Sequence, residues 1–99
     1  PKLGEAYLLL GLAYAEQKET AKSIHAYQQA IASTPDLGEA HYRLAQAYRQ
    51  TGEAAKAEAE LRLYEKISKT DTEEAETERR QTQQFVYQLQ QTKPAPQPE

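Results

Sequence analysis

The residues best able to do chemistry are two histidines, His25 and His41, and a run of carboxylates at residues 73–78. An imidazole can act as a general acid or base or as a metal ligand, and carboxylates can bind a divalent cation. The two histidines lie sixteen residues apart, and no carboxylate stands at a metal-motif spacing from either one. The four glutamates of residues 73–78 wind around a helix and do not converge on one point. We therefore interpret the run as a solvated helix start, His41 as a packing residue and His25 as a surface residue.

Other reactive groups are absent or scattered. The chain has no Cys, and so no thiolate nucleophile, thiolate metal site or disulfide. Its four glycines are isolated, so no loop could cradle a phosphate group. The seven tyrosines fall at helical spacing and are interpreted as core aromatics. We expect no catalytic site, no metal and no cofactor, and thus a protein that is not an enzyme.

The composition predicts an all-α protein. Ala, Gln, Glu, Lys and Leu, which favour helix, dominate the 99 residues. Val occurs once, Phe once and Ile three times, which leaves little from which to build a sheet. A chain of this length forms at most one small domain with a thin core.

Charge and hydropathy narrow the range of partners. The net charge is −3, and residues 70–99, with three basic and six acidic side chains, account for all of it. Because nucleic-acid binding requires a basic surface, we expect no nucleic-acid partner. No apolar run reaches the roughly 20 residues of a membrane span. We expect a soluble protein, with the cytoplasm slightly preferred, although the lack of Cys fits either redox environment.

The strongest pattern is an internal repeat of 34 residues. At that offset, eleven of the first 34 positions are identical without a gap. Such a period is typical of stacked helical repeats. The chain has neither an initiator Met nor a basic and apolar leader, so we expect it to be part of a longer protein.

Each unit has the apolar pattern of two helices, and Pro35 ends the second helix of the first unit. The residues expected to fill the core of the first unit are Ala6, Leu10, Ala13, Tyr14, Ile24, Tyr27, Ala30 and Ile31. The residues expected to fill the core of the second unit are Ala40, Leu44, Ala47, Tyr48, Ala54, Ala57, Leu61 and Tyr64.

Three positions predict local backbone geometry. Gly52 suits a left-handed residue between the two helices of the second unit. Lys18 occupies the equivalent place in the first unit and would cost about 1 kcal/mol in that conformation. Gly11 lies inside a helix, where it costs about 1 kcal/mol relative to Ala. We therefore expect the partner helix to approach closely at Gly11.

Residues 1–69 resemble the tetratricopeptide repeat family. The family pattern is a bulky aromatic residue, Leu-Gly, Tyr, and then small, aromatic, small and Pro in the second helix. The first unit supplies Tyr7, Leu10-Gly11, Tyr14, Ser23, Tyr27, Ala30 and Pro35. The second unit supplies His41, Leu44-Ala45, Tyr48, Ala57 and Leu61, and departs from the pattern at Tyr64 and Lys69. Because terminal repeats are atypical, we expect the second unit to be the last.

The resemblance implies a right-handed superhelical stack of antiparallel helix pairs. We expect the end of a preceding repeat at residues 1–3, units at 4–37 and 38–70, and a C-terminal capping helix at 71–91. Thr70 or Asp71 would form a capping box with the glutamates that follow, and the late apolar residues would pack on the last repeat. No Pro or Gly separates residues 54–69 from 71–91, so one long helix is an alternative. Residues 92–99 are predicted to be a disordered Pro-rich tail.

The resemblance also implies a concave surface lined by the first helix of each unit. We name this predicted set the groove: Glu5, Leu8, Leu9, Leu12, Glu39, Tyr42, Arg43, Gln46 and Arg49. Three exposed leucines would form an apolar patch that suits a partner, and the two arginines could meet an acidic residue on a ligand. The chain has no Asn and only Arg43 of the residues that family members use to clamp a chaperone carboxylate, so we do not expect that activity.

The leading hypothesis is a non-catalytic scaffold that binds a partner peptide or helix in the groove. The alternative is a structural module, in which the same apolar surface forms a homodimer or stacks on upstream repeats as the end of a longer array.

Overall fold

The computed structural model describes residues 2–92, which contain four helices and no strand. The helices are α1 (Leu3–Glu16), α2 (Thr20–Ser33), α3 (Gly38–Gln50) and α4 (Ala54–Gln91). The all-α prediction is confirmed. The chain divides into two compact units, one ending at Lys69 and the other beginning at Thr70. Pro1 and residues 93–99, which include most of the predicted Pro-rich tail, lie outside the described residues.

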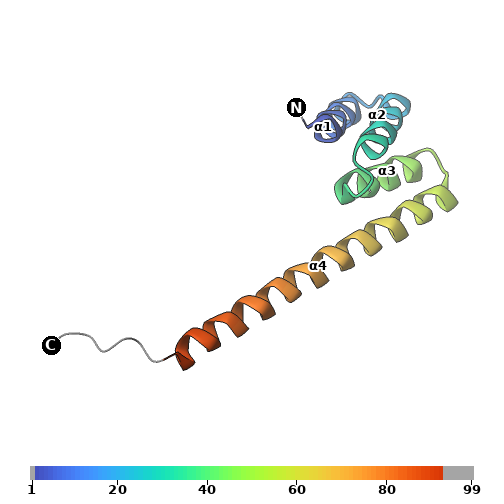
Figure 1. Cartoon of the computed structure of the whole chain (residues 1–99). Coiled ribbons are helices and arrows are strands. Elements are labelled where there is room, and N and C mark those ends of the chain that lie inside the picture. The colour runs from blue at the N-terminus through green and yellow to red at the C-terminus, as the bar shows by residue number, and fades with distance from the viewer. Residues whose placement is uncertain (1, 93–99) are drawn as a thin grey trace. The chain divides into compact units, whose positions relative to one another are not determined.

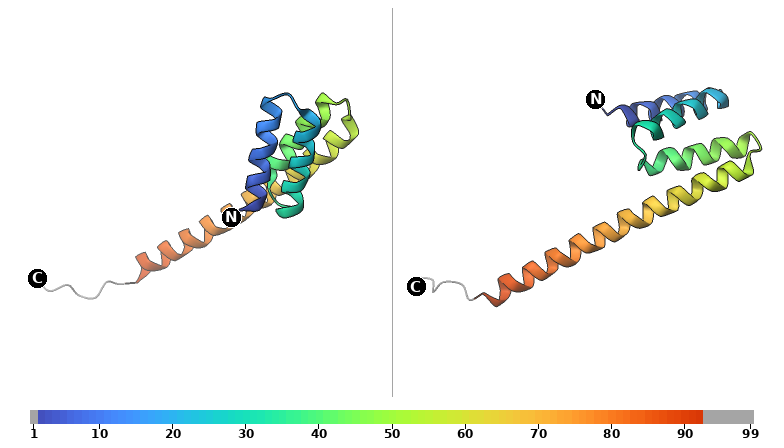
Figure 2. Two further views of the ribbon diagram at one scale, coloured as in Figure 1. Left: turned by 90° about the horizontal axis from the view of Figure 1, so that it is seen from above. Right: turned by 45° about the vertical axis from the view of Figure 1, so that its right-hand side comes forward.

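The first unit is a stack of helices in which α1 and α2 form one antiparallel pair (Figure 1). Helix α3 and the first part of α4 form a second antiparallel pair (Figure 2). The core between them is rich in alanine, which lets helices approach closely. Its buried members are Leu8, Tyr27, Ala30, Ala40, Leu44, Ala45, Ala47, Tyr48 and Ala57.

The turn inside each pair uses one left-handed residue, as the repeat predicted. Lys18 has φ 62° and Gly52 has φ 79°. The same backbone hydrogen bond closes both turns: the N–H of Glu19 donates to Tyr14 O at 2.9 Å, and that of Glu53 donates to Tyr48 O at 2.8 Å. Because Lys18 carries a side chain, its left-handed backbone costs about 1–2 kcal/mol, a cost that Gly52 avoids.

Gly11 marks the closest approach of α1 to α2. A Cβ added at Gly11 would overlap the ring of Tyr27, which is itself buried. The predicted close approach is therefore confirmed. At the equivalent place in α3, Ala45 is accommodated and is 1% exposed, so α4 leaves room for one methyl group that α2 does not.

The predicted core of α1 is partly wrong. Leu10 is 41% exposed, and Ala6 and Ala13 are exposed as well. The residues of α1 that are buried are Gly4, Leu8 and Gly11. They lie on a different stripe of the helix, nearly opposite the predicted one and facing α2, while the predicted stripe corresponds to the side of α3 that α2 covers. Local periodicity did not separate these two stripes.

Helix α4 runs from Ala54 to Gln91 without a break. The helix start expected at Thr70 or Asp71 is wrong, because nothing between residues 54 and 91 terminates a helix and the alternative of one long helix holds. Residues 70–92 are all exposed. The expected packing of residues 71–91 on the last repeat stays a prediction. None of the described helices is long and apolar enough to cross a bilayer.

Candidate functional site

Two hollows lie along α1 and α3, and most of the groove residues line them. The larger, of about 230 Å³, is lined by Glu5, Leu8, Leu9, Leu37 and Glu39. The smaller, of about 80 Å³, is lined by Leu12, Ala15, Ser23, Tyr27, Arg43, Gln46, Ala47 and Gln50. The first hollow thus contains four of the predicted groove residues and the second contains three, which is seven of the nine.

The three leucines of the groove have different environments. Leu9 is 65% exposed, Leu12 is half-buried, and Leu8 is only 5% exposed and belongs to the core. The apolar patch of three leucines considered from the sequence is therefore reduced. Leu9 is the most exposed leucine of the three, and the buried Leu8 lines the same hollow.

Arg43 is the main polar group of the smaller hollow. Its Nη2 lies 3.5 Å from Glu39 Oε1, and its Nη1 donates to Gln46 Oε1 at 3.4 Å. Its Nε is buried and has no hydrogen-bond partner among the described residues. A buried donor without a partner costs about 1–3 kcal/mol, so the guanidinium retains capacity for an acceptor that the described residues do not supply.

The ring of Tyr27 forms part of the same hollow. Burial raises the pKa of the Tyr27 hydroxyl above its ordinary value of 10.0, while the positive charge of Arg43 opposes the shift and Glu39 adds to it. The hydroxyl is therefore neutral at physiological pH and leaves the charge of Arg43 uncompensated by Tyr27.

The remaining groove residues lie outside the two hollows. Tyr42 is 38% exposed, and its ring pairs with that of Tyr64 at 5.3 Å between centroids. Tyr64 occupies a position where the family pattern has a small residue. Its larger side chain makes this ring contact with Tyr42. Arg49 is exposed near the end of α3.

Comparison with known families decides the family. Two family models match the chain. One, described as TPR repeat, matches residues 11–52, and the other, described as tetratricopeptide repeat, matches residues 38–71. The chain belongs to the tetratricopeptide repeat family. Repeats of this family are generally protein-interaction modules and are typically non-catalytic scaffolds. No curated protein matches the chain.

His41, which takes the aromatic place of the second tetratricopeptide repeat, is 4% exposed, as expected for a packing residue. Its Nε2 lies 2.8 Å from Pro35 O and its Nδ1 lies 2.6 Å from Glu60 Oε2. A carbonyl oxygen only accepts, so Nε2 carries a hydrogen and donates it. Sequence reasoning missed Glu60, because no local spacing connects two residues on different helices.

His25 is exposed, and its Nε2 lies 3.2 Å from Gln29 Nε2 one turn later. Among residues 2–92, no three His, Asp or Glu side chains gather closely enough to hold a metal ion. The two imidazoles thus belong to separate local environments, one in the core and one on the surface.

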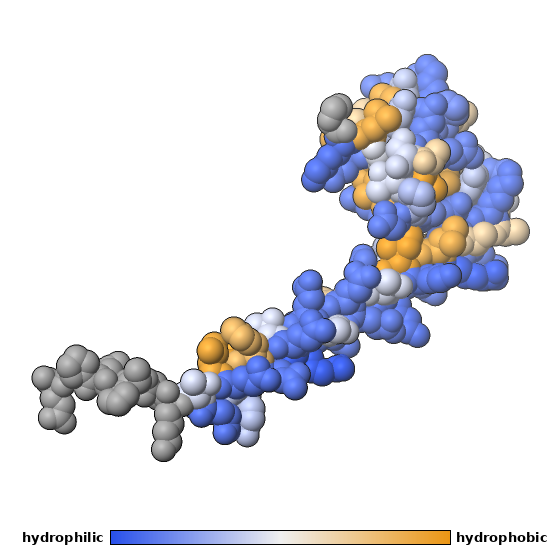
Figure 3. Space-filling model, viewed as in Figure 1, coloured by the Kyte–Doolittle hydropathy of each residue, from blue (hydrophilic) through white to orange (hydrophobic). Residues whose placement is uncertain are grey.

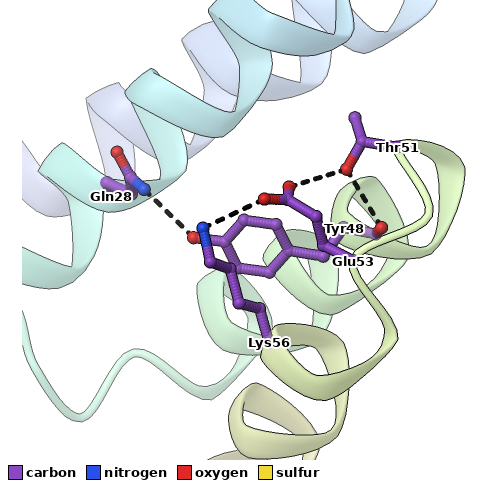
Figure 4. A network of polar contacts seen from close by, with 5 residues as sticks. All are labelled: Gln28, Tyr48, Thr51, Glu53 and Lys56. Carbon is purple, nitrogen blue, oxygen red and sulfur yellow. Dashed lines mark hydrogen bonds and ion pairs between the residues drawn. The ribbon is translucent and has the colours of Figure 1, made fainter.

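A polar network joins the two repeats (Figure 4). Gln28 of α2 donates from Nε2 to the Tyr48 hydroxyl of α3 at 3.1 Å. Beside it, Glu53 accepts from Lys56 at 3.0 Å and from the Thr51 hydroxyl at 2.8 Å. These bonds, that of Lys56 first, lower the pKa of Glu53 below its ordinary value of 4.5. The ammonium of Lys56 also lies 5.6 Å from the centroid of the Tyr48 ring, a cation–π distance.

Proposed function

We propose that this chain is a protein-interaction module that binds a partner peptide or helix in the groove of its two repeats. The observation that carries the proposal is the exposed Leu9, 65% accessible in a hollow whose rim bears Glu5 and Glu39. An exposed apolar side chain in a hollow, flanked by charged groups, suits a ligand with an apolar anchor and polar neighbours.

The chemistry of Arg43 indicates the polar part of the ligand. Its pair with Glu39 is partly exposed, with side-chain accessibilities of 39% and 53%, and exposed pairs of this kind contribute little stability. A ligand carboxylate or carbonyl could replace Glu39 at low cost. We therefore propose that the ligand places an apolar side chain on Leu9 and Leu12 and an acceptor near Arg43.

The proposed function involves no catalysis. Both ring nitrogens of His41 are engaged inside the core, by Pro35 and Glu60. His25 is a surface residue with Gln29 as its neighbour. Neither imidazole faces one of the hollows of the groove, so neither is positioned to act on a ligand bound there.

The test begins with peptides selected from a phage-displayed library against the chain. The selected peptides are then titrated against the wild type, Leu9→Glu, Arg43→Ala and Leu10→Glu. Loss of a central apolar anchor is expected to weaken binding by about tenfold or more in the Leu9 variant. The Leu10 variant is the matched control, because Leu10 is the next residue on α1 but lines neither hollow of the groove.

Two outcomes would contradict the proposal. The first is that selection yields no peptide that binds the wild type. The second is that Leu9→Glu binds the selected peptides as tightly as the wild type does, which would place the binding surface elsewhere.

A further inference from the structure

The N-terminal face of the first repeat is uncovered. We give this name to Ala6, Leu10, Ala13 and Tyr14, a stripe of α1 distinct from the groove. Leu10 is 41% exposed, Tyr14 is half-buried and the two alanines are exposed. Figure 3 shows apolar residues at the surface of the first unit.

The second repeat shows how such a stripe is covered, because it carries the same four residue types at the offset of 34. There Ala40, Leu44, Ala47 and Tyr48 are 0%, 2%, 3% and 8% exposed. Helix α2 covers them with an apolar stripe that includes Tyr27, and Gln28 donates to the Tyr48 hydroxyl. A suitable cover for this kind of face is thus a helix with apolar side chains and an amide donor.

Tyr14 and Tyr48 have a lysine at the same place beside the ring. Lys22 lies 5.7 Å from the centroid of the Tyr14 ring, as Lys56 lies 5.6 Å from that of Tyr48. Gln29, the amide that lines the hollow beside Tyr14, has its Nε2 3.2 Å from His25 Nε2, and the hydrogen bond from Gln28 to the Tyr48 hydroxyl has no counterpart at Tyr14 among residues 2–92. A hollow of about 400 Å³ opens there instead, lined by Leu10 and Tyr14 together with residues of α2 that include Ala21, Lys22 and His25.

The last turns of α4 carry a second uncovered apolar surface. Phe85, Val86 and Leu89 are 59%, 47% and 58% exposed, and apolar atoms gather near that end of α4 in Figure 3. Gln88 stands three residues after Phe85, so it shares the face of Phe85 and Leu89. This set, the apolar end of α4, offers the same chemistry that α2 offers to α3: apolar side chains with one amide donor.

We propose that the apolar end of α4 in one copy of this chain docks on the N-terminal face of a second copy. Both surfaces are exposed among the described residues, and a second copy of the chain offers each of them a cover of matching chemistry. Gln88 takes the role of Gln28 and donates to the Tyr14 hydroxyl of the second copy. The contact joins two different surfaces, so it is head-to-tail: it closes into a ring or continues as a chain of copies. It is independent of the groove.

Sedimentation velocity tests the proposal on the full chain at concentrations up to about 1 mM, the dissociation constant of a weak contact. The wild type is expected to sediment faster as its concentration rises. Leu10→Glu and Phe85→Glu each place a charge in the contact and are expected to remain monomers. Leu9→Glu is the matched control and is expected to associate like the wild type. Circular dichroism checks that each variant keeps its helix content.

Mixing the two variants makes the test specific for a head-to-tail contact. Leu10→Glu retains an intact apolar end of α4, and Phe85→Glu retains an intact N-terminal face. Each is expected to be a monomer alone, and an equimolar mixture is expected to form a 1:1 complex that grows no further. A contact between two identical surfaces would show no such complementation.

The hydrogen bond has its own measurement. Tyr14→Phe and Gln88→Ala are each expected to weaken association about two- to tenfold, and the double variant no more than either one alone. A wild type that stays monomeric to the highest concentration overturns the proposal. So does association that persists in Leu10→Glu, or a mixture that does not combine.

Discussion

The first helices of the two repeats, α1 and α3, carry Ala, Leu, Ala and Tyr at equivalent positions. In α3 the leucine, Leu44, is 2% exposed, and in α1 the leucine, Leu10, is 41% exposed. The residues and their spacing are the same, and the difference is the helix that lies on them. α3 has α2 on this side, and within the described part of the first unit no helix lies on α1 there. Whether a residue of a repeat is buried therefore depends on the helix that packs against it, and the sequence pattern shows only that the residue could be buried.

The largest expected effect comes from truncating the two leucines of this comparison. Leu44→Ala removes a buried side chain and is expected to lower the free energy of unfolding by about 2–5 kcal/mol. Leu10→Ala removes a side chain that already meets solvent and is expected to cost less than about 1 kcal/mol. Urea unfolding of both variants at low protein concentration measures the difference. Equal costs would mean that the N-terminal face is buried in solution.

A second difference between the repeats is the space at the middle of each first helix. Gly11→Ala gains helix propensity of about 1 kcal/mol, but its Cβ overlaps the buried ring of Tyr27. Overpacking of this kind costs about 1–3 kcal/mol, so a net loss of stability is expected. Thermal unfolding followed by circular dichroism measures it. Tyr27→Leu combined with Gly11→Ala should recover part of the loss, and a stabilised single variant would contradict the expected overlap.

The turns differ by one side chain at the left-handed position. Lys18→Gly is expected to raise the free energy of unfolding by about 1 kcal/mol, because glycine adopts φ near 60° without steric cost. Gly52→Ala, at the equivalent turn, is expected to lower it by a similar amount. Chemical denaturation compares the two midpoints. The interpretation fails if both substitutions change stability in the same direction.

The smallest expected effect is a pH dependence confined to the second repeat's turn. The folded pKa of Glu53 lies below its ordinary value of 4.5, so its bonds stabilise the fold above that value. The contribution is lost as the pH falls below 4.5 and through the folded pKa. The stabilities of the wild type and Glu53→Gln, measured by urea unfolding from pH 7 to pH 3, should therefore converge on acidification. Parallel curves would contradict this assignment.

Sequence reasoning predicted the features that depend on period and backbone chemistry. The repeat, the two helix pairs, the left-handed turns and the close approach at Gly11 all follow from local rules that hold wherever such residues occur. The misassignment of Leu8 and Leu10 has a different origin. Each belongs to its own stripe of α1 at helical spacing, and deciding which stripe faces α2 requires knowing the rotation of one helix against another.

The contacts between side chains on different helices could not be predicted from the sequence either. Glu60 contacts His41, and Tyr64 contacts Tyr42, each pair joining α4 to α3. The spacing of residues along one helix does not predict which side chains of another helix they contact. The long α4 was foreseen only as an alternative, because the capping-box residues at 70–74 serve equally well inside a helix. A sequence signal for the start of a helix does not end the helix before it. Residues 54–69 contain no Pro or Gly that would end that helix.

The side-chain bonds between helices in this chain join neighbours along the sequence, and this has a consequence for how the chain folds. The bond from Thr20 to Gln50 spans 30 residues, and the bond from Gln28 to Tyr48 spans 20. A structure held by contacts this local has a low contact order, which corresponds to folding within microseconds to milliseconds. During synthesis, α1 and α2 can close on each other while α3 is still being made.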